Sequence, residues 1–180
     1  MKRSLLLVLL CAALAGGASV QADGLTPPPE LQQLGVALGH WVFHGTSAAT
    51  SNRPAQPFTW DSHCDWSPNH WYLECAFSNT YVGRKVESLV VNSYNTTDHT
   101  FWHYEFFSAG QSGKSPFVTK MDVEDNVWTE YGREAIPGKQ KGQRIIYAWM
   151  PPDRVDMKIE TSDDGTTWTT VNHAEGRKEP

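Results

Sequence analysis

The chain has 180 residues, of which 39% are hydrophobic and 12% aromatic, and its formal net charge at pH 7 is −5. That length fits one domain with enough chain for a sizeable core. The acidic balance argues against nucleic acid or an anionic membrane surface as a partner.

The first 22 residues have the pattern of a secretory signal peptide. Lys2 and Arg3 form a basic start, residues 5–14 are apolar but too few to span a bilayer, and residues 20–22 read Val-Gln-Ala, a small-residue cleavage site. Cleavage after Ala22 would leave 158 residues and a net charge of −7, because it removes two basic side chains and no acidic one. No later stretch could span a bilayer as an apolar helix. We therefore expect a periplasmic or secreted protein without stable membrane insertion.

Two cysteines, Cys64 and Cys75, remain after this cleavage. If Asn69 and His70 form a two-residue turn, since Asn tolerates a positive φ, the two sulfurs face each other across a hairpin. We predict a disulfide, which would persist in an oxidising compartment. A metal-bound or nucleophilic thiol is the alternative. Lipidation of Cys11 is disfavoured because Leu residues precede it where small ones are required.

The mature chain divides into a leader, a short helix and one long run of strands. Residues 23–38 hold three consecutive prolines and then, over 30–38, leucines at helical spacing. Over residues 39–175, apolar and polar residues alternate with a period of two, which predicts a single β domain. Residues 176–180 are expected to form a C-terminal tail. Strands are predicted at 40–47, 58–66, 70–78, 85–95, 100–108, 116–123, 126–133, 142–150, 154–161 and 167–173.

The connections between these strands are short and rich in turn residues, so consecutive strands should be antiparallel neighbours. A meander of this length closes on itself to remove its edges. The sequence thus predicts an all-β, antiparallel up-and-down barrel of about 8–10 strands with a short N-terminal helix.

Several short motifs carry a family resemblance. They are Gly39-x-Trp41, the pair Trp60 and Trp66 followed by Trp71, Ser93-Tyr94-Asn95, Trp128-Thr129-x-Tyr131-Gly132, and the segment from Lys158 to Trp168. With these motifs the chain resembles the calycin superfamily, the lipocalin-like barrels, and more closely a group of secreted bacterial domains of uncharacterised function. In lipocalins the Trp of Gly-x-Trp packs across the closed end of the barrel, and the resemblance assigns this role to Trp41.

Residues 161–168 match the Asp-box of sialidase propellers, Ser/Thr-x-Asp-x-Gly-x-Thr-Trp. Physically the motif is a hairpin turn in which an Asp carboxylate accepts from turn N–H groups, Gly165 supplies a positive φ and Trp168 packs beneath. It occurs once in a chain too short for a propeller. We therefore expect a structural turn and no glycosidase chemistry.

The strand at 100–108 offers two alternative faces to the barrel interior. Its odd face carries His103 and Glu105, about 7 Å apart along the strand, a plausible acid/base pair. Its even face carries Trp102, Tyr104 and Phe106, which would make an aromatic ligand wall. The sequence does not say which face points inward.

The aromatic content, with eight Trp, six Tyr and seven Phe, favours a binding role. Such side chains suit a small apolar or amphipathic ligand in a partly wet cavity, and Trp60 and Trp149 are further candidate contacts. The alternative is a cofactor-free isomerase, cyclase or hydrolase that uses His103 and Glu105. A haem-binding barrel is a third hypothesis, although no cofactor is predicted. The oligomeric state is left open.

No metal site is predicted. His40 and His44 share a strand face, but residues i and i+4 of a strand stand about 13 Å apart, too far to bind one ion jointly.

Overall fold

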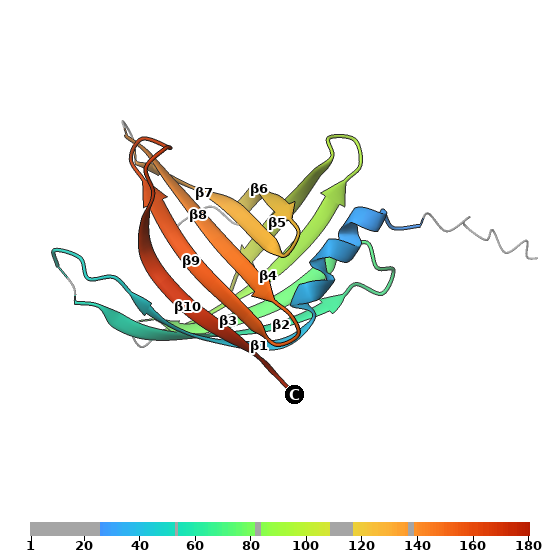
Figure 1. Ribbon diagram of the computed structural model, residues 1–180, viewed down its shortest axis with the longest axis horizontal. Helices are drawn as coiled ribbons and strands as arrows, with labels where there is room; N and C mark the ends of the chain where they lie inside the picture. Colours follow the sequence, from blue (N-terminus) through green and yellow to red (C-terminus); the bar gives the residue numbers. More distant parts are fainter. Residues whose placement is uncertain (1–25, 53, 82–83, 109–116, 137–138) are drawn as a thin grey trace, which may run out of the picture.

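The computed structural model describes residues 26–180 except 53, 82–83, 109–116 and 137–138, so the predicted signal peptide lies outside the described residues. Within the described part, ten antiparallel strands close into one barrel (Figure 1). Each strand pairs with its neighbours in sequence, and β1 pairs with β10 to complete the ring. The strands are β1 (Gly39–Ser47), β2 (Gln56–Trp66), β3 (Leu73–Tyr81), β4 (Arg84–Asn95), β5 (Thr100–Phe107), β6 (Phe117–Glu124), β7 (Val127–Ile136), β8 (Lys139–Met150), β9 (Arg154–Ser162) and β10 (Thr169–Glu179).

The predicted barrel and its ten strands are therefore confirmed, and the largest difference in strand bounds is at the C-terminus. β10 continues to Glu179, whereas the prediction ended the strand at residue 173 and left 176–180 as a tail. Gly176 pairs with Phe43 of β1 and Val155 of β9, so this segment is part of the barrel wall. A Cβ at Gly176 would lie 2.5 Å from Val155 Cγ1. The absence of a side chain at Gly176 thus makes room for a packed neighbour.

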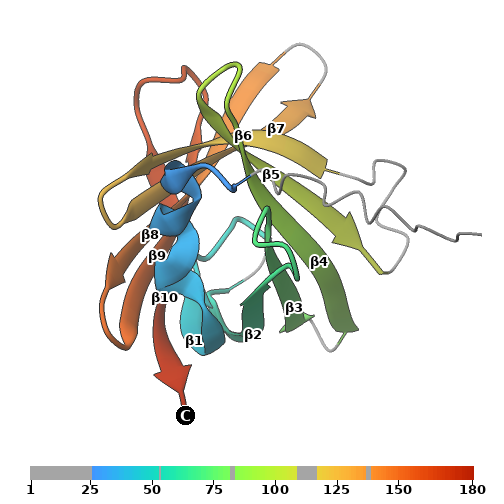
Figure 2. The ribbon, with the colours of Figure 1, turned by 90° about the vertical axis from the view of Figure 1, so that its right-hand side faces the viewer.

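A 3₁₀ helix, η1 (Pro29–Ala37), lies at the end of the barrel seen face-on in Figure 2. The sequence predicts a helix over 30–38 with Leu31, Leu34 and Leu38 on one face. The buried residues of η1 are instead Leu31, Leu34 and Ala37, at intervals of three. A 3₁₀ helix has three residues per turn, so this spacing places all three on one face, against the barrel. No helix in the described part of the chain is long and apolar enough to cross a membrane.

Trp41 closes the barrel beneath η1. Its side chain is 1% exposed, and its Nε1 donates to the carbonyl oxygens of Ala37 at 3.0 Å and Leu38 at 3.3 Å. Its ring meets the ring of Trp149 edge-on, with centroids 5.1 Å apart. The indole thus ties η1 to the barrel interior, which is the position that the resemblance assigns to it.

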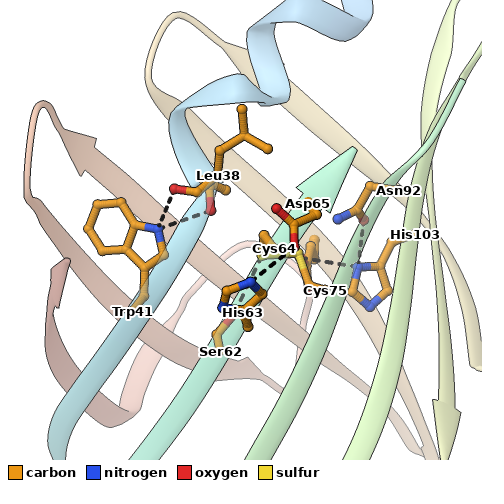
Figure 3. The surroundings of a disulfide bond; sticks show 11 residues. Leu38, Trp41, Ser62, His63, Cys64, Asp65, Cys75, Asn92 and His103 are labelled. Atoms are coloured by element: carbon orange, nitrogen blue, oxygen red, sulfur yellow. Dashed lines mark hydrogen bonds and ion pairs between the residues drawn. A yellow bond between two sulfur atoms is a disulfide. The ribbon is translucent and has the colours of Figure 1, made fainter. Parts of the chain in front are cut away.

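The disulfide between Cys64 and Cys75 is confirmed, with the two Cα atoms 4.1 Å apart (Figure 3). The cysteines face each other across β2 and β3, and His70 in the intervening turn has a φ of 60°. Both side chains are buried, and Figure 3 places them between Trp41 and His103. The bond therefore joins two strands from within the core.

Replacing both Cys64 and Cys75 with alanine should lower the free energy of unfolding by about 2–3 kcal/mol, the loop-closure contribution expected for so short a loop. Urea denaturation measures the loss, and reduced wild-type protein should reproduce most of it. If a thiol reagent modifies both residues in the folded, oxidised protein, the bond is not there.

The predicted Asp-box turn lies between β9 and β10 at the opposite end of the barrel from η1. The Asp164 carboxylate accepts from the backbone N–H groups of Thr166 at 2.8 Å and Thr167 at 2.7 Å, and these bonds hold the pKa of Asp164 well below its usual range. Gly165 has a φ of 75°. The Trp168 ring packs against the Arg144 guanidinium, 4.2 Å from the ring centroid. The motif forms a well-bonded turn, as expected.

Candidate functional site

The barrel encloses a cavity of about 530 Å³ at the end away from η1. This volume falls in the range of about 300–1,000 Å³ that small-molecule sites occupy. The wall has an apolar part and a polar part. Its apolar side chains are Trp60, Phe77, Val86, Val90, Phe107, Phe117, Ile145 and Ile159, and its polar ones are Ser78, Asn79, Ser88, His103, Glu105, Glu130, Gln143 and Tyr147.

His103 projects into the barrel from the middle of β5. It pairs with Asn92 of β4, and its Nδ1 lies 3.0 Å from Asn92 Oδ1 and 3.3 Å from Glu130 Oε1. Both of these atoms accept hydrogen bonds when the Glu130 carboxyl is ionised, so Nδ1 is the nitrogen that carries the proton. His103 is 5% exposed and Glu130 is 7% exposed. The three side chains form a buried polar network at the inner end of the cavity, and Figure 3 shows Asn92 above the imidazole.

The electrostatics of this network raise the pKa of His103. Burial opposes the charged form, but the Glu130 carboxylate, its hydrogen bond and the nearby Glu105 outweigh burial, so the pKa of His103 lies above its ordinary value. The imidazolium and the Glu130 carboxylate can then form a buried ion pair.

Glu105 lies two residues further along β5, toward the mouth of the cavity. Ser88 Oγ donates to Glu105 Oε1 at 2.8 Å. Burial raises the pKa of Glu105, and this effect exceeds the opposing influence of the Ser88 hydrogen bond and the His103 charge. Tyr147 faces the same cavity from β8, and its burial raises the pKa of the phenol well above the ordinary value.

The structure settles which face of β5 points inward. The odd face, with His103 and Glu105, lines the cavity together with the predicted contact Trp60. Trp102, Tyr104 and Phe106 lie on the outside of the barrel, so the proposal that they wall the interior is corrected. The reason is the register with β4 and β6, which sets His103 opposite the inward-facing Asn92 and Thr119.

The outward side chains of β5 line an outer groove instead. Phe106 is 42% exposed, and Trp102 Nε1 donates to Asp98 Oδ2 at 3.3 Å. The groove is bounded by Trp71, Tyr72, Val91, Ser93, Tyr94, Asn95, Thr96, Trp102, Tyr104 and Phe106.

Trp149 is inside the barrel but does not line the cavity. It is 7% exposed and packs among the rings of Trp41, Trp128 and Tyr147, with centroids 5.0–6.0 Å away. Its place is therefore in the core at the closed end, rather than in the predicted ligand wall.

Glu130, Asn92 and Ser88 belong to the site but were not predicted. A signal for Glu130 existed in the sequence. The inward position of Trp128 and the period of two along β7 place Glu130 on the same inward face, where a carboxylate is unusual. The inward position of Asn92 and Ser88 could not be predicted in this way, because small polar residues occur on either face of a strand.

The described residues contain no group of three or more His, Cys, Asp or Glu side chains arranged to hold a metal ion. His103 is the one histidine among the described residues that line the cavity.

No protein-family model matches the chain, and no curated protein matches it significantly. Among solved structures, the crystal structure of Rv2717c from M. tuberculosis aligns with a TM-score of 0.54 at 10% sequence identity, and the alignment covers 86% of this chain and 99% of that one. The chain shares the fold of that protein. A ten-strand antiparallel barrel also fits the calycin-like class that the sequence resembles.

Proposed function

We propose that this protein binds a small amphipathic molecule inside the barrel, as an exported ligand-binding protein. The observation that carries the proposal is the cavity of about 530 Å³, with an apolar wall on one side and His103, Glu105 and Glu130 on the other. Apolar area supplies affinity in such a site, and a few convergent polar groups fix orientation. The disulfide supports a location in an oxidising compartment.

Blocking the cavity should abolish binding without unfolding the barrel. Gly132 lines the cavity from β7, and a Cβ there would meet its nearest neighbour at 3.5 Å, an ordinary contact. A leucine at this position should therefore project into the cavity. We expect Gly132→Leu to weaken binding of the neutral fluorescent probe N-phenyl-1-naphthylamine by at least tenfold, about 1.4 kcal/mol, as measured by fluorescence titration.

Val127→Leu is the matched control, because Val127 is on the same strand but 41% exposed on the outer surface. It should bind the probe as the wild type does. Equal binding by both variants would place the probe outside the barrel and count against the proposal. Titration with hemin tests the haem alternative, which requires a Soret band that His103→Gln removes.

A second function, acid/base catalysis without a cofactor, is favoured by one observation. Glu105 combines a raised pKa with a position beside His103 on the same cavity wall. Groups with such perturbed pKa values cluster at catalytic sites. For an enzyme that uses His103 as its base, His103→Gln should lower turnover by about 10²–10⁴. For a binding protein, the same change should leave probe affinity within about threefold.

A further inference from the structure

The charges that line the cavity are unbalanced. Two carboxylates, Glu105 and Glu130, face one histidine, and the described lining residues include no lysine or arginine. Glu130 has a partner in His103, at 3.3 Å, which is cationic when the imidazole is protonated. Glu105 accepts a hydrogen bond from the neutral hydroxyl of Ser88, at 2.8 Å. An ionised Glu105 therefore leaves the cavity with one negative charge that no basic side chain in its wall offsets.

One polar atom elsewhere in the same wall lacks a donor. Asn79 Oδ1 is buried and has no hydrogen-bond partner among the described residues. Asn79 and Glu105 both line the cavity, but their partners on β4 are Val86 and Val90, four residues apart, which is about 13 Å along a strand. A buried acceptor without a donor costs roughly 1–3 kcal/mol. The cavity wall thus presents an unpaired acceptor at Asn79, apart from the carboxylate of Glu105, to a polar group elsewhere on a bound molecule.

We infer that the ligand is an amphipathic amine, whose positively charged head group binds at Glu105 and whose apolar part lies against the aromatic and aliphatic wall. An ammonium group has three donors and no acceptor, which complements a carboxylate that contributes one net negative charge. Its charge-assisted bond to a carboxylate is about twice as strong as a neutral one. Phe77, Val86, Phe107 and Ile159 provide apolar surface for the tail. This inference rests on the proposed function and adds the chemical class of the ligand.

Three probes with the same tail test the head group. Decylamine, decanol and decanoate should displace N-phenyl-1-naphthylamine from the wild-type protein in that order of affinity, with the amine at least tenfold tighter than the alcohol. The affinity for decylamine should also rise with pH. Because the pKa of Glu105 is raised, its carboxylate forms at a higher pH than that of an ordinary glutamate, and the amine is still protonated at that pH. Decanol should show no such rise.

Glu105→Gln removes the inferred partner and keeps similar bulk. It should weaken decylamine binding at least tenfold and change decanol binding less than threefold. Glu87→Gln is the matched control, since it removes the same charge from β4 at a solvent-exposed site paired with Lys85. It should leave both affinities unchanged, which separates a local effect from one of net charge.

The possible failures are distinguishable. If the naphthylamine probe does not bind, the proposed function fails. If that probe binds but decanoate displaces it as well as or better than decylamine, the inferred ligand class alone is overturned. Equal losses of decylamine affinity in Glu105→Gln and Glu87→Gln would also overturn it, because attraction would then come from the acidic surface as a whole.

Discussion

Replacing Trp41 with alanine should lower the free energy of unfolding by about 3–5 kcal/mol, the range for large buried aromatic side chains. The indole is almost fully buried, donates to two carbonyl oxygens that connect η1 to β1, and packs edge-on against Trp149. Its removal would leave a cavity beneath η1. Chemical denaturation followed by far-ultraviolet circular dichroism measures the loss.

Phe106→Ala is the control for this substitution, because Phe106 is also aromatic but is 42% exposed on the outer face of β5. It should cost less than about 1 kcal/mol. A comparably small loss for Trp41→Ala would mean that the closed end of the barrel does not depend on this side chain.

Replacing His103 with leucine should destabilise the protein by about 3–5 kcal/mol near neutral pH, because Glu130 would remain buried without its cationic partner. The histidine and the carboxylate are both more than nine-tenths buried, and Nδ1 of His103 lies 3.3 Å from Glu130 Oε1. Asn92 Oδ1 would lose its donor as well. Urea denaturation of the single variant gives the size of the effect.

The double variant His103→Leu/Glu130→Leu is the companion measurement. It removes both charges, so it should be more stable than His103→Leu alone. Additive losses from the two substitutions would mean that the side chains do not interact.

The stability that His103 contributes should depend on pH in a defined direction. Its folded-state pKa is raised above the ordinary value of 6.5. The contribution is therefore fully present below about pH 6.5 and is lost as the pH rises through the folded-state pKa. The difference in unfolding free energy between wild type and His103→Leu should shrink over this interval.

Local sequence patterns predicted most of the fold. The alternation in Val155, Met157 and Ile159 predicted an inward face, and these three side chains are buried. The equal spacing of Cys64 and Cys75 about residues 69 and 70 predicted that they face each other, and they do, because hairpin register is fixed locally. The turn itself differs from the predicted one, since the strands are separated by residues 67–72 and the positive φ is at His70, not Asn69. The type of the N-terminal helix was not predictable in this way, because burial of Ala37 instead of Leu38 depends on how η1 meets the barrel.

The site was only partly predictable because it depends on closure of the barrel. Both faces of β5 carry aromatic side chains, so alternation alone could not choose between His103 and Trp102 as the inward residue. Register with β4 and β6 decides the question. The pairing of His103 with Glu130 joins β5 to β7, which are not neighbours in the barrel, and no local pattern encodes such a contact.

The central claim is that the barrel interior holds a small molecule, and native mass spectrometry of protein purified from the cells that make it tests this most directly. We predict that the wild-type protein carries an additional non-covalent mass of a few hundred daltons, that organic extraction releases an amine of that mass, and that Gly132→Leu protein carries none. The claim would be contradicted if the wild-type and Gly132→Leu proteins gave the same spectrum, either both without an additional mass or both with the same additional mass.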